Sequence, residues 1–260
     1  QNTVSDGVDT LTAIENLNGS AFADQLTGDA GNNRLIGNAG FDILVGGLGD
    51  DFLSGGADHD VASYAGLGTG VTVNLGITTA QDTLGGGIDT LVGIEGLVGT
   101  NHADRLTGNA FGNGINGGGG DDVIDAGGGS GPDFLSGGTG NDVIKGGGGA
   151  DNLLGDAGAD ILTGGAGNDN FEYNLANESR IGSGVDRITD FAMGDILDIS
   201  EVDANALTTG IDENEAFVLV ASFTRRAGEL TLAFDAGSNT TTLLGDTNGD
   251  GVGDFSILFT

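Results

Sequence analysis

The sequence predicts an all-β fold, a solenoid made by repetition of a short unit, and three observations support this. First, residues 19–63 form five nine-residue units, which begin at Gly19, Gly28, Gly37, Gly46 and Gly55. Second, each unit has glycine or a small polar residue early, which permits a tight turn with positive φ. Third, its last three residues alternate outward, inward and outward like a short strand. Units of fixed period bury their apolar faces only against neighbouring units, as in a solenoid.

The sixth position of each unit is acidic or an amide, and usually Leu follows at the eighth. In this first ladder the sixth residues are Asp24, Asn33, Asp42, Asp51 and Asp60. Two units can close one oblong coil, so that units one, three and five stack on one edge with their carboxylates about 4.8 Å apart. Bare carboxylates at that spacing repel each other, so the stack requires a cation. Carboxylate and carbonyl oxygens in a flexible turn, without His or Cys, favour calcium over zinc or copper.

The units resemble the RTX, or hemolysin-type calcium-binding, nonapeptide G-G-x-G-x-D-x-U-x, most clearly at Gly46–Ser54. This resemblance implies a parallel β-roll in which calcium lies between one turn and the turn two units later. The sixth-position carboxylates and glycine carbonyls would hold it. The edge with Asn33 and Asp51 departs from the pattern, so its first site should be weaker. The alternative is a periodic glycine-rich coil that binds no metal.

Composition limits the class of protein. The chain has 260 residues, 54 of them glycine, and a formal charge of −32. This charge argues against a nucleic-acid partner or an anionic membrane. This charge fits either a solvated acidic surface or the binding of roughly six to ten calcium ions. About nine calcium ions, for example, would neutralise roughly 18 negative charges. The chain has no cysteine for disulfides or thiolate metal sites, and no apolar run long enough for membrane insertion as a helix.

Residues 1–18 are expected to be the tail of a preceding repeat module. Shifted by 80 positions, they match the start of a second copy: Gly7, Asp9 and Leu11 correspond to Gly87, Asp89 and Leu91. We therefore expect the chain to be the C-terminal piece of a longer protein.

Residues 64–98 are expected to be a linker module. The segment 71–75 alternates as a strand, and the spacing of Leu91, Ile94 and Leu97 suggests further short strands that continue the solenoid between two ladders. Glu15 and Glu95 lie in this repeated frame, so a hydrogen-bonding or surface role is favoured over catalysis.

The second ladder is expected at residues 99–172, with eight units. One unit, 126–136, is stretched by two residues around Pro132, which should bulge without breaking the alternation of edges. The sixth-position metal candidates are Asp104, Asn113, Asp122, Asp133, Asp142, Asp151, Asp160 and Asp169. The inward apolar partners are Leu106, Ile115, Ile124, Leu135, Ile144, Leu153, Leu162 and Phe171.

Residues 173–260 are expected to form a β-sandwich-like capping and secretion domain. Strands are predicted at 171–173, 185–191, 195–200, 217–220, 229–234, 241–244 and 255–259. The segments D-R-I-T-D-F-A-M-G-D-I-L-D-I-S and G-D-T-N-G-D-G-V-G-D-F resemble the C-terminal domain of serralysin-type proteins. That resemblance implies a cap on the roll and an uncleaved signal for type I secretion.

One loop in this region has the oxygen spacing of an EF-hand. Asp246, Asn248, Asp250 and Asp254 occupy positions one, three, five and nine, with glycine at six, but position twelve is Ile257 rather than Glu. The loop is therefore either a calcium site or a plain Asx-rich hairpin turn.

The sequence predicts no enzyme activity. His59 and His102 are the only histidines, and neither belongs to an H-E-x-x-H helix. Asp50 and Asp51 could imitate a glycosidase pair, but their recurrence as Asp121 and Asp122 favours a structural role.

Three functions fit these observations. The first is a calcium-binding module of a secreted bacterial protein, at the cell surface or outside it, which folds on extracellular calcium and engages type I secretion machinery. The second is a region for calcium-dependent self-association in a surface layer, adhesin or filament. The third is a non-catalytic appendage of a secreted protease, lipase or alginate epimerase.

Overall fold

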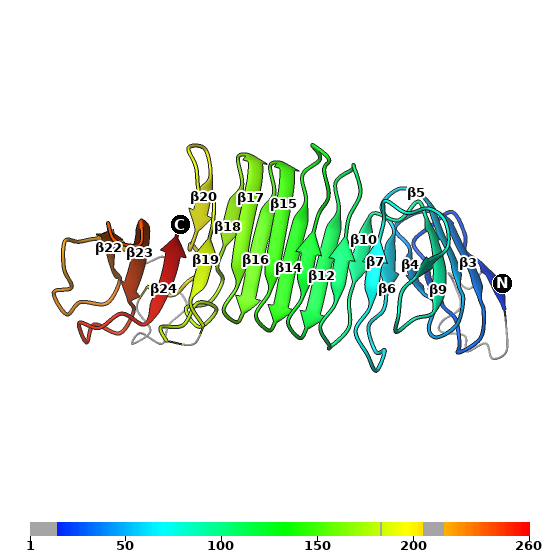
Figure 1. The fold of residues 1–260 in the computed structure, drawn as a ribbon, viewed down its shortest axis with the longest axis horizontal. Coiled ribbons are helices and arrows are strands. Elements are labelled where there is room, and N and C mark those ends of the chain that lie inside the picture. Colours follow the sequence, from blue (N-terminus) through cyan, green and yellow to red (C-terminus); the bar gives the residue numbers. More distant parts are fainter. Residues whose placement is uncertain (1–14, 183, 205–215) are drawn as a thin grey trace.

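The computed structural model describes residues 15–182, 184–204 and 216–260, which form one elongated stack of strands (Figure 1). No helix occurs in these residues, so the predicted all-β class is confirmed. Accordingly, the described part offers no helix long and apolar enough to span a membrane. The proposed tail module, 1–18, falls outside the described residues except for 15–18.

The strands form three sheets, in which neighbours in the stack are hydrogen-bonded. The five-stranded sheet has the order β1 (Asn16–Asn18), β3 (Arg34–Ala39), β5 (Phe52–Ala57), β9 (Ile88–Val92), β8 (Gln81–Asp82). The nine-stranded sheet has the order β2 (Gln25–Thr27), β4 (Ile43–Val45), β6 (Val61–Ser63), β10 (Gly96–Val98), β12 (Gly114–Gly119), β14 (Phe134–Thr139), β16 (Asn152–Ala157), β18 (Asn170–Glu172), β20 (Ile196–Asp198). The ten-stranded sheet has the order β21 (Val218–Leu219), β22 (Glu229–Asp235), β23 (Thr240–Asp246), β24 (Phe255–Phe259), β19 (Asp186–Ile188), β17 (Ile161–Gly167), β15 (Val143–Gly149), β13 (Val123–Asp125), β11 (Arg105–Thr107), β7 (Thr72–Asn74).

Successive nine-residue units alternate between two sheets, as the repeat predicts. Units one, three and five give β2, β4 and β6, which pair in parallel, and units two and four give β3 and β5. The stretched unit keeps this alternation, because β14 pairs in parallel with both β12 and β16. Its two extra residues are therefore accommodated in the turn, and the predicted bulge is confirmed.

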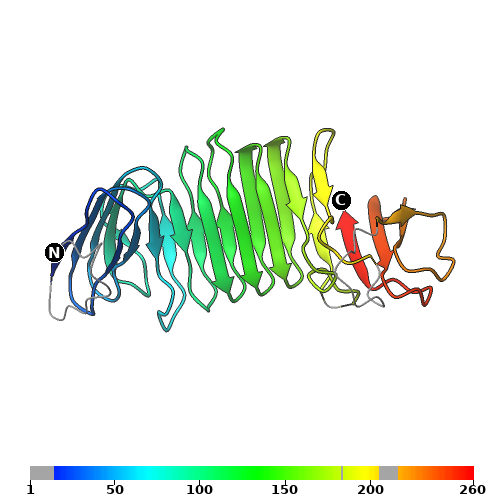
Figure 2. The same ribbon diagram turned by 180° about the vertical axis from the view of Figure 1, so that it is seen from behind.

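The linker joins the ladders through one continuous sheet. Strand β10 pairs with β6 of the first ladder and with β12 of the second. On the other side of the coil the five-stranded sheet ends with β9 and β8, and the ten-stranded sheet begins with β7 (Figure 2). The expected strand at 71–75 is thus present, with Val71, Val73 and Leu75 buried.

The core is a file of apolar side chains, one from each unit, stacked inside the roll between the nine-stranded sheet and the two sheets on the opposite face. The predicted inward residues of the second ladder are all at most 2% exposed, as are Leu35, Leu44 and Leu53 of the first. Leu26, near the N-terminal end of the described stack, is only partly buried. Complete burial of one such side chain stabilises the fold by about 1.5–3 kcal/mol.

All seven predicted C-terminal strands are present, and they continue the sheets of the roll. Strands β18 and β20 extend the nine-stranded sheet, while β19 pairs in parallel with β17 and with β24. Strands β24, β23 and β22 are antiparallel neighbours in the ten-stranded sheet. The cap therefore covers the edge of β17, which would otherwise expose unpaired backbone groups.

The burial of side chains in the roll predicts that two adjacent leucines, Leu153 and Leu154, contribute very different amounts to the free energy of unfolding. Leu153→Ala should lower the free energy of unfolding at saturating calcium by about 2–5 kcal/mol, because it leaves a cavity in the file. Leu154→Ala is the matched control: this side chain is only half-buried, so its loss should be well below that of Leu153. Urea denaturation measures both, and equal losses would contradict the core described here.

Candidate metal centre

The sixth residue of each unit lies immediately before a strand and points into the roll. All thirteen except Asp24, which is partly buried, are at most 4% exposed. The stacking of coils gathers them into four columns. These columns are Asp24, Asp42 and Asp60; Asn33 and Asp51; Asp104, Asp122, Asp142 and Asp160; and Asn113, Asp133, Asp151 and Asp169.

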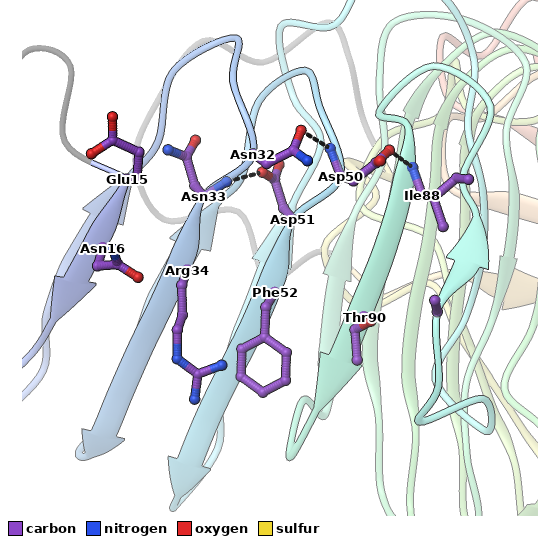
Figure 3. A pocket seen from close by; sticks show the side chains of 11 residues that line it. Glu15, Asn16, Asn32, Asn33, Arg34, Asp50, Asp51, Phe52, Ile88 and Thr90 are labelled. Atoms are coloured by element: carbon purple, nitrogen blue, oxygen red, sulfur yellow. Dashed lines mark hydrogen bonds between the residues drawn. The ribbon is translucent and has the colours of Figure 1, made fainter.

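One oxygen of each carboxylate is fixed by the backbone of the neighbouring coil. The Asn33 amide donates to Oδ1 of Asp51 at 2.8 Å, as Figure 3 shows, and the Asp122 amide donates to Oδ1 of Asp142 at 2.8 Å. The same contact links successive members along every column. These bonds hold the carboxylates in register, one per coil.

The other oxygen is buried without a hydrogen-bond partner in eight ladder residues. These are Asp42, Asp51, Asp60, Asp122, Asp142, Asp151, Asp160 and Asp169, through Oδ2 in each. An unpaired buried carboxylate oxygen is costly, so each Oδ2 requires a proton or a cation.

Oxygens from two coils flank the same small space. A Cβ placed on Gly37 would lie 2.1 Å from Oδ2 of Asp42 and 2.7 Å from the carbonyl oxygen of Gly55, one coil away. On Gly137 it would lie 2.3 Å from Oδ2 of Asp142 and 2.8 Å from the carbonyl oxygen of Gly155. Glycine at the first position of these units is therefore required sterically, whereas the stretched unit begins with Ala126.

This donor set fits a hard cation such as calcium, which takes carboxylate and carbonyl oxygens in flexible geometry. Within the described residues no three His, Asp or Glu side chains converge on one point. A cation there would accordingly take most of its ligands from backbone carbonyls.

Burial raises the pKa values of the ladder carboxylates. Desolvation is the main cause, backbone hydrogen bonds oppose it, and neighbouring carboxylates add to it. The pKa values of Asp51, Asp60, Asp133 and Asp142 rise to about 6, and that of Asp122 to about 7. For Asp160 the pKa rises to about 8. Protons therefore compete with a cation for these oxygens near neutral pH.

The columns include four acids that the repeat pattern missed. Asp89, Glu95, Asp186 and Asp195 accept the backbone amides of Asp51, Asp60, Asp160 and Asp169, respectively, at 2.9–3.1 Å. An acid followed two residues later by an aliphatic residue, as in the ladder, marks all four. None of them, however, has glycine five residues earlier, at the first position of a unit, where the sequence has Leu84, Thr90, Ile181 and Asp190. The interpretation of Glu95 as a hydrogen-bonding residue is thus confirmed.

Asp89 shows how the linker satisfies a column carboxylate without a cation. Its Oδ2 accepts hydrogen bonds from the Tyr64 hydroxyl at 3.1 Å and the Thr83 hydroxyl at 2.9 Å. In the linker, hydroxyl groups therefore donate to the Oδ2 atom, which has no hydrogen-bond partner in eight of the ladder units.

The loop from Asp246 to Asp254 connects β23 to β24. Asp246 accepts the amides of Gly249 at 2.6 Å and Gly251 at 2.8 Å, and Asp254 accepts the side-chain amide of Asn248 at 2.8 Å and the Thr247 amide at 2.7 Å. These contacts form an Asx-rich hairpin turn. Calcium at Asp246, Asn248, Asp250 and Asp254 stays a prediction.

The residues considered for catalysis have structural contacts instead. His59 stacks on Phe41 with ring centroids 5.7 Å apart, and the backbone amide of His102 donates to the Thr100 hydroxyl at 2.9 Å. Asp50 accepts the Ile88 amide at 3.0 Å, and its own amide donates to Asn32 (Figure 3). Asp50 therefore ties adjacent coils together.

The raised pKa values predict that the calcium-free chain folds better in acid than at neutral pH. The folded-state pKa values, about 6 to 8, exceed the unfolded value of 3.8, so the folded chain binds more protons. This stabilisation is complete below about pH 4 and is lost as the pH rises through about 6 to 8. Circular dichroism in chelator should show β signal increasing from about pH 8 to about pH 5. Loss of β signal on acidification over this range would contradict the assignment; saturating calcium should abolish the gain.

Comparison with known proteins finds one repeat family. The RTX calcium-binding nonapeptide repeat (4 copies) matches residues 9–44, 27–62, 98–131, 128–162 and 146–175, just over half of the chain. The comparison of this chain with curated proteins finds no match.

Similar solved structures include the AlgE6R2 subunit of a mannuronan C5-epimerase from Azotobacter vinelandii, at 26% identity over 62% of this chain and 81% of that one, with a TM-score of 0.34. The AlgE6R3 subunit is 24% identical over 61% and 71%, with a TM-score of 0.33. The extracellular lipase LipA from Serratia marcescens is 15% identical over 99% of this chain and 39% of its own, with a TM-score of 0.29. From the extent of the repeat match, the chain belongs to the RTX calcium-binding nonapeptide repeat family.

Proposed function

We propose that this calcium-binding module couples its folding to extracellular calcium through the ladder carboxylates. The observation behind this is the row of eight buried Oδ2 atoms without hydrogen-bond partners, each beside the turn of its own unit. The proposed ligands are these eight sixth-position carboxylates together with turn carbonyls of adjacent coils. The role is binding rather than catalysis, and the structural contacts of His59, His102 and Asp50 support that.

Affinities typical of extracellular modules would make this coupling large. With a Kd of about 0.1 mM, calcium at about 1 mM stabilises the folded state by roughly 1.4 kcal/mol per site. Eight such sites would contribute about 11 kcal/mol, comparable with the whole stability of an ordinary domain, about 5–15 kcal/mol. At sub-micromolar calcium this contribution disappears, and the chain's charge of −32 opposes compaction.

A secretion role follows from this difference in calcium concentration. The chain would stay unfolded inside the cell, where type I secretion machinery can export it, and would fold outside. The cap at β19–β24 pairs directly with the last ladder strands, so it offers a surface on which the roll can form from its C-terminal end.

A calcium titration tests this function. Isothermal calorimetry should show cooperative uptake of several ions, and far-UV circular dichroism in parallel should show a matching gain of β signal. Uptake without folding, or no uptake, would refute the coupling. Light scattering in the same titration reports whether calcium also drives self-association.

A single ladder substitution should weaken this response. Asp142→Asn removes a charged ligand at a site that is 0% exposed, so the free energy of unfolding at about 1 mM calcium should fall by about 1–3 kcal/mol. The control is Asp82→Asn, at an exposed linker position, which should change stability by at most about 0.5 kcal/mol. Chemical denaturation at fixed calcium measures both, and an unchanged Asp142→Asn variant would contradict the ligand assignment.

A further inference from the structure

The ladder units fall into two conformational classes, distinguished by the second residue of the unit. In all eight units with an unpartnered Oδ2, this residue has a positive φ, between 62° and 122°. Six of these second residues are glycine, and the other two are Asn38 and Asp156, with φ of 85° and 62°. Gly127, second in the unit of Asp133, has a φ of 99° and belongs to the same class. We call these nine units open.

The other four units are closed by their own backbone. Their second residues, Ser20, Asp29, Thr100 and Asn109, do not have positive φ. In each, the amide of the second residue donates to the side-chain oxygen of the sixth. The distances are 2.5 Å for Ser20 to Asp24, 2.8 Å for Asp29 to Asn33, 2.6 Å for Thr100 to Asp104 and 2.8 Å for Asn109 to Asn113.

We infer that the second residue of a unit decides whether its sixth-position side chain takes a cation, and that the four closed units take none through that oxygen. This inference rests on the proposed calcium binding and adds which units take part. The N–H group donates to the oxygen that a cation would need, and its positive end faces the same oxygen, so the two partners compete for it.

The chemistry of the sixth residue supports this independently. Both amides of the ladders, Asn33 and Asn113, occur in closed units, whereas all nine open units have Asp. A neutral amide suffices where an N–H group is the partner, and Asn113 also donates to the carbonyl of Glu95 at 3.0 Å.

Where a closed unit keeps its carboxylate, a hydroxyl at the second position supplies an additional donor. The Ser20 hydroxyl donates to Oδ2 of Asp24 at 2.9 Å, and the Thr100 hydroxyl donates to Oδ1 of Asp104 at 3.1 Å. Both carboxylates of the closed units thus have a hydroxyl donor in addition to the backbone amide of the second residue. Because the closed units are the first two of each ladder, each ladder begins with a coil that is satisfied without an ion.

Two neighbouring aspartates in one column test the inference. Asp104 lies in a closed unit and Asp122 in the open unit stacked on it. Calorimetric stoichiometry should show fewer bound ions for Asp122→Asn than for the unsubstituted chain, and an unchanged number for Asp104→Asn, although the latter loses a hydrogen-bond acceptor. Equal losses in the two variants, or none in Asp122→Asn, would overturn it. No calcium uptake by the unsubstituted chain would instead refute the proposed function.

A second pair of variants decides the matter if Asp104→Asn fails to fold, as judged by circular dichroism in saturating calcium. Thr100→Gly removes the hydroxyl and permits positive φ, so it should add one bound ion. Thr100→Ser keeps the hydroxyl and disfavours positive φ, so its stoichiometry should equal that of the unsubstituted chain. Equal stoichiometry in Thr100→Gly and Thr100→Ser would overturn the inference.

Discussion

The structure depends on a stack of buried carboxylates, each with one oxygen that accepts a hydrogen bond from the protein and, in eight of the nine open units, a second oxygen that is buried without a partner. The satisfied oxygen accepts an amide from the neighbouring coil, which fixes the register between coils. In the eight units with a buried, unpartnered Oδ2, this oxygen lies so close to the first residue that only glycine fits there. The repeat keeps its period because the sixth-position side chain of each unit must stack on the sixth-position side chain of the unit one coil away.

The core and the carboxylate columns are built by the same units. The sixth and eighth residues of a unit are two apart, so both side chains point to the inside of the roll. The aliphatic residue fills the core, as Ile144 does at 0% exposure, while Asp142 beside it carries a buried charge. This burial raises the carboxylate pKa values, so the packing that stabilises the roll also makes it depend on a bound cation or proton.

Much of this was predictable because it repeats. The unit boundaries, the alternation of edges, the inward aliphatic residues and the tolerance of the stretched unit follow from sequence spacing alone. Asp89, Glu95, Asp186 and Asp195 were missed because they join the columns without a glycine at the first position of a nine-residue unit.

Other features depend on contacts that local sequence does not specify. Asn38 and Asp156 occupy left-handed positions that non-glycine residues rarely adopt, so residue type alone does not separate open from closed units. The seven C-terminal strands were recognisable, but the pairing of β19 with β24 joins Asp186 to Ile257 across a long stretch of chain. Their continuity with the roll therefore required the tertiary structure.

Anomalous diffraction from crystals of the calcium-loaded chain tests the central claim most directly, because it locates each ion relative to the carboxylates. The account predicts ions beside the sixth-position carboxylates of the open units, with calcium about 2.3–2.6 Å from the Oδ2 atoms of residues such as Asp42, Asp122 and Asp142. An ordered roll whose anomalous peaks lie only on exposed carboxylates, with none along the buried columns, would contradict it.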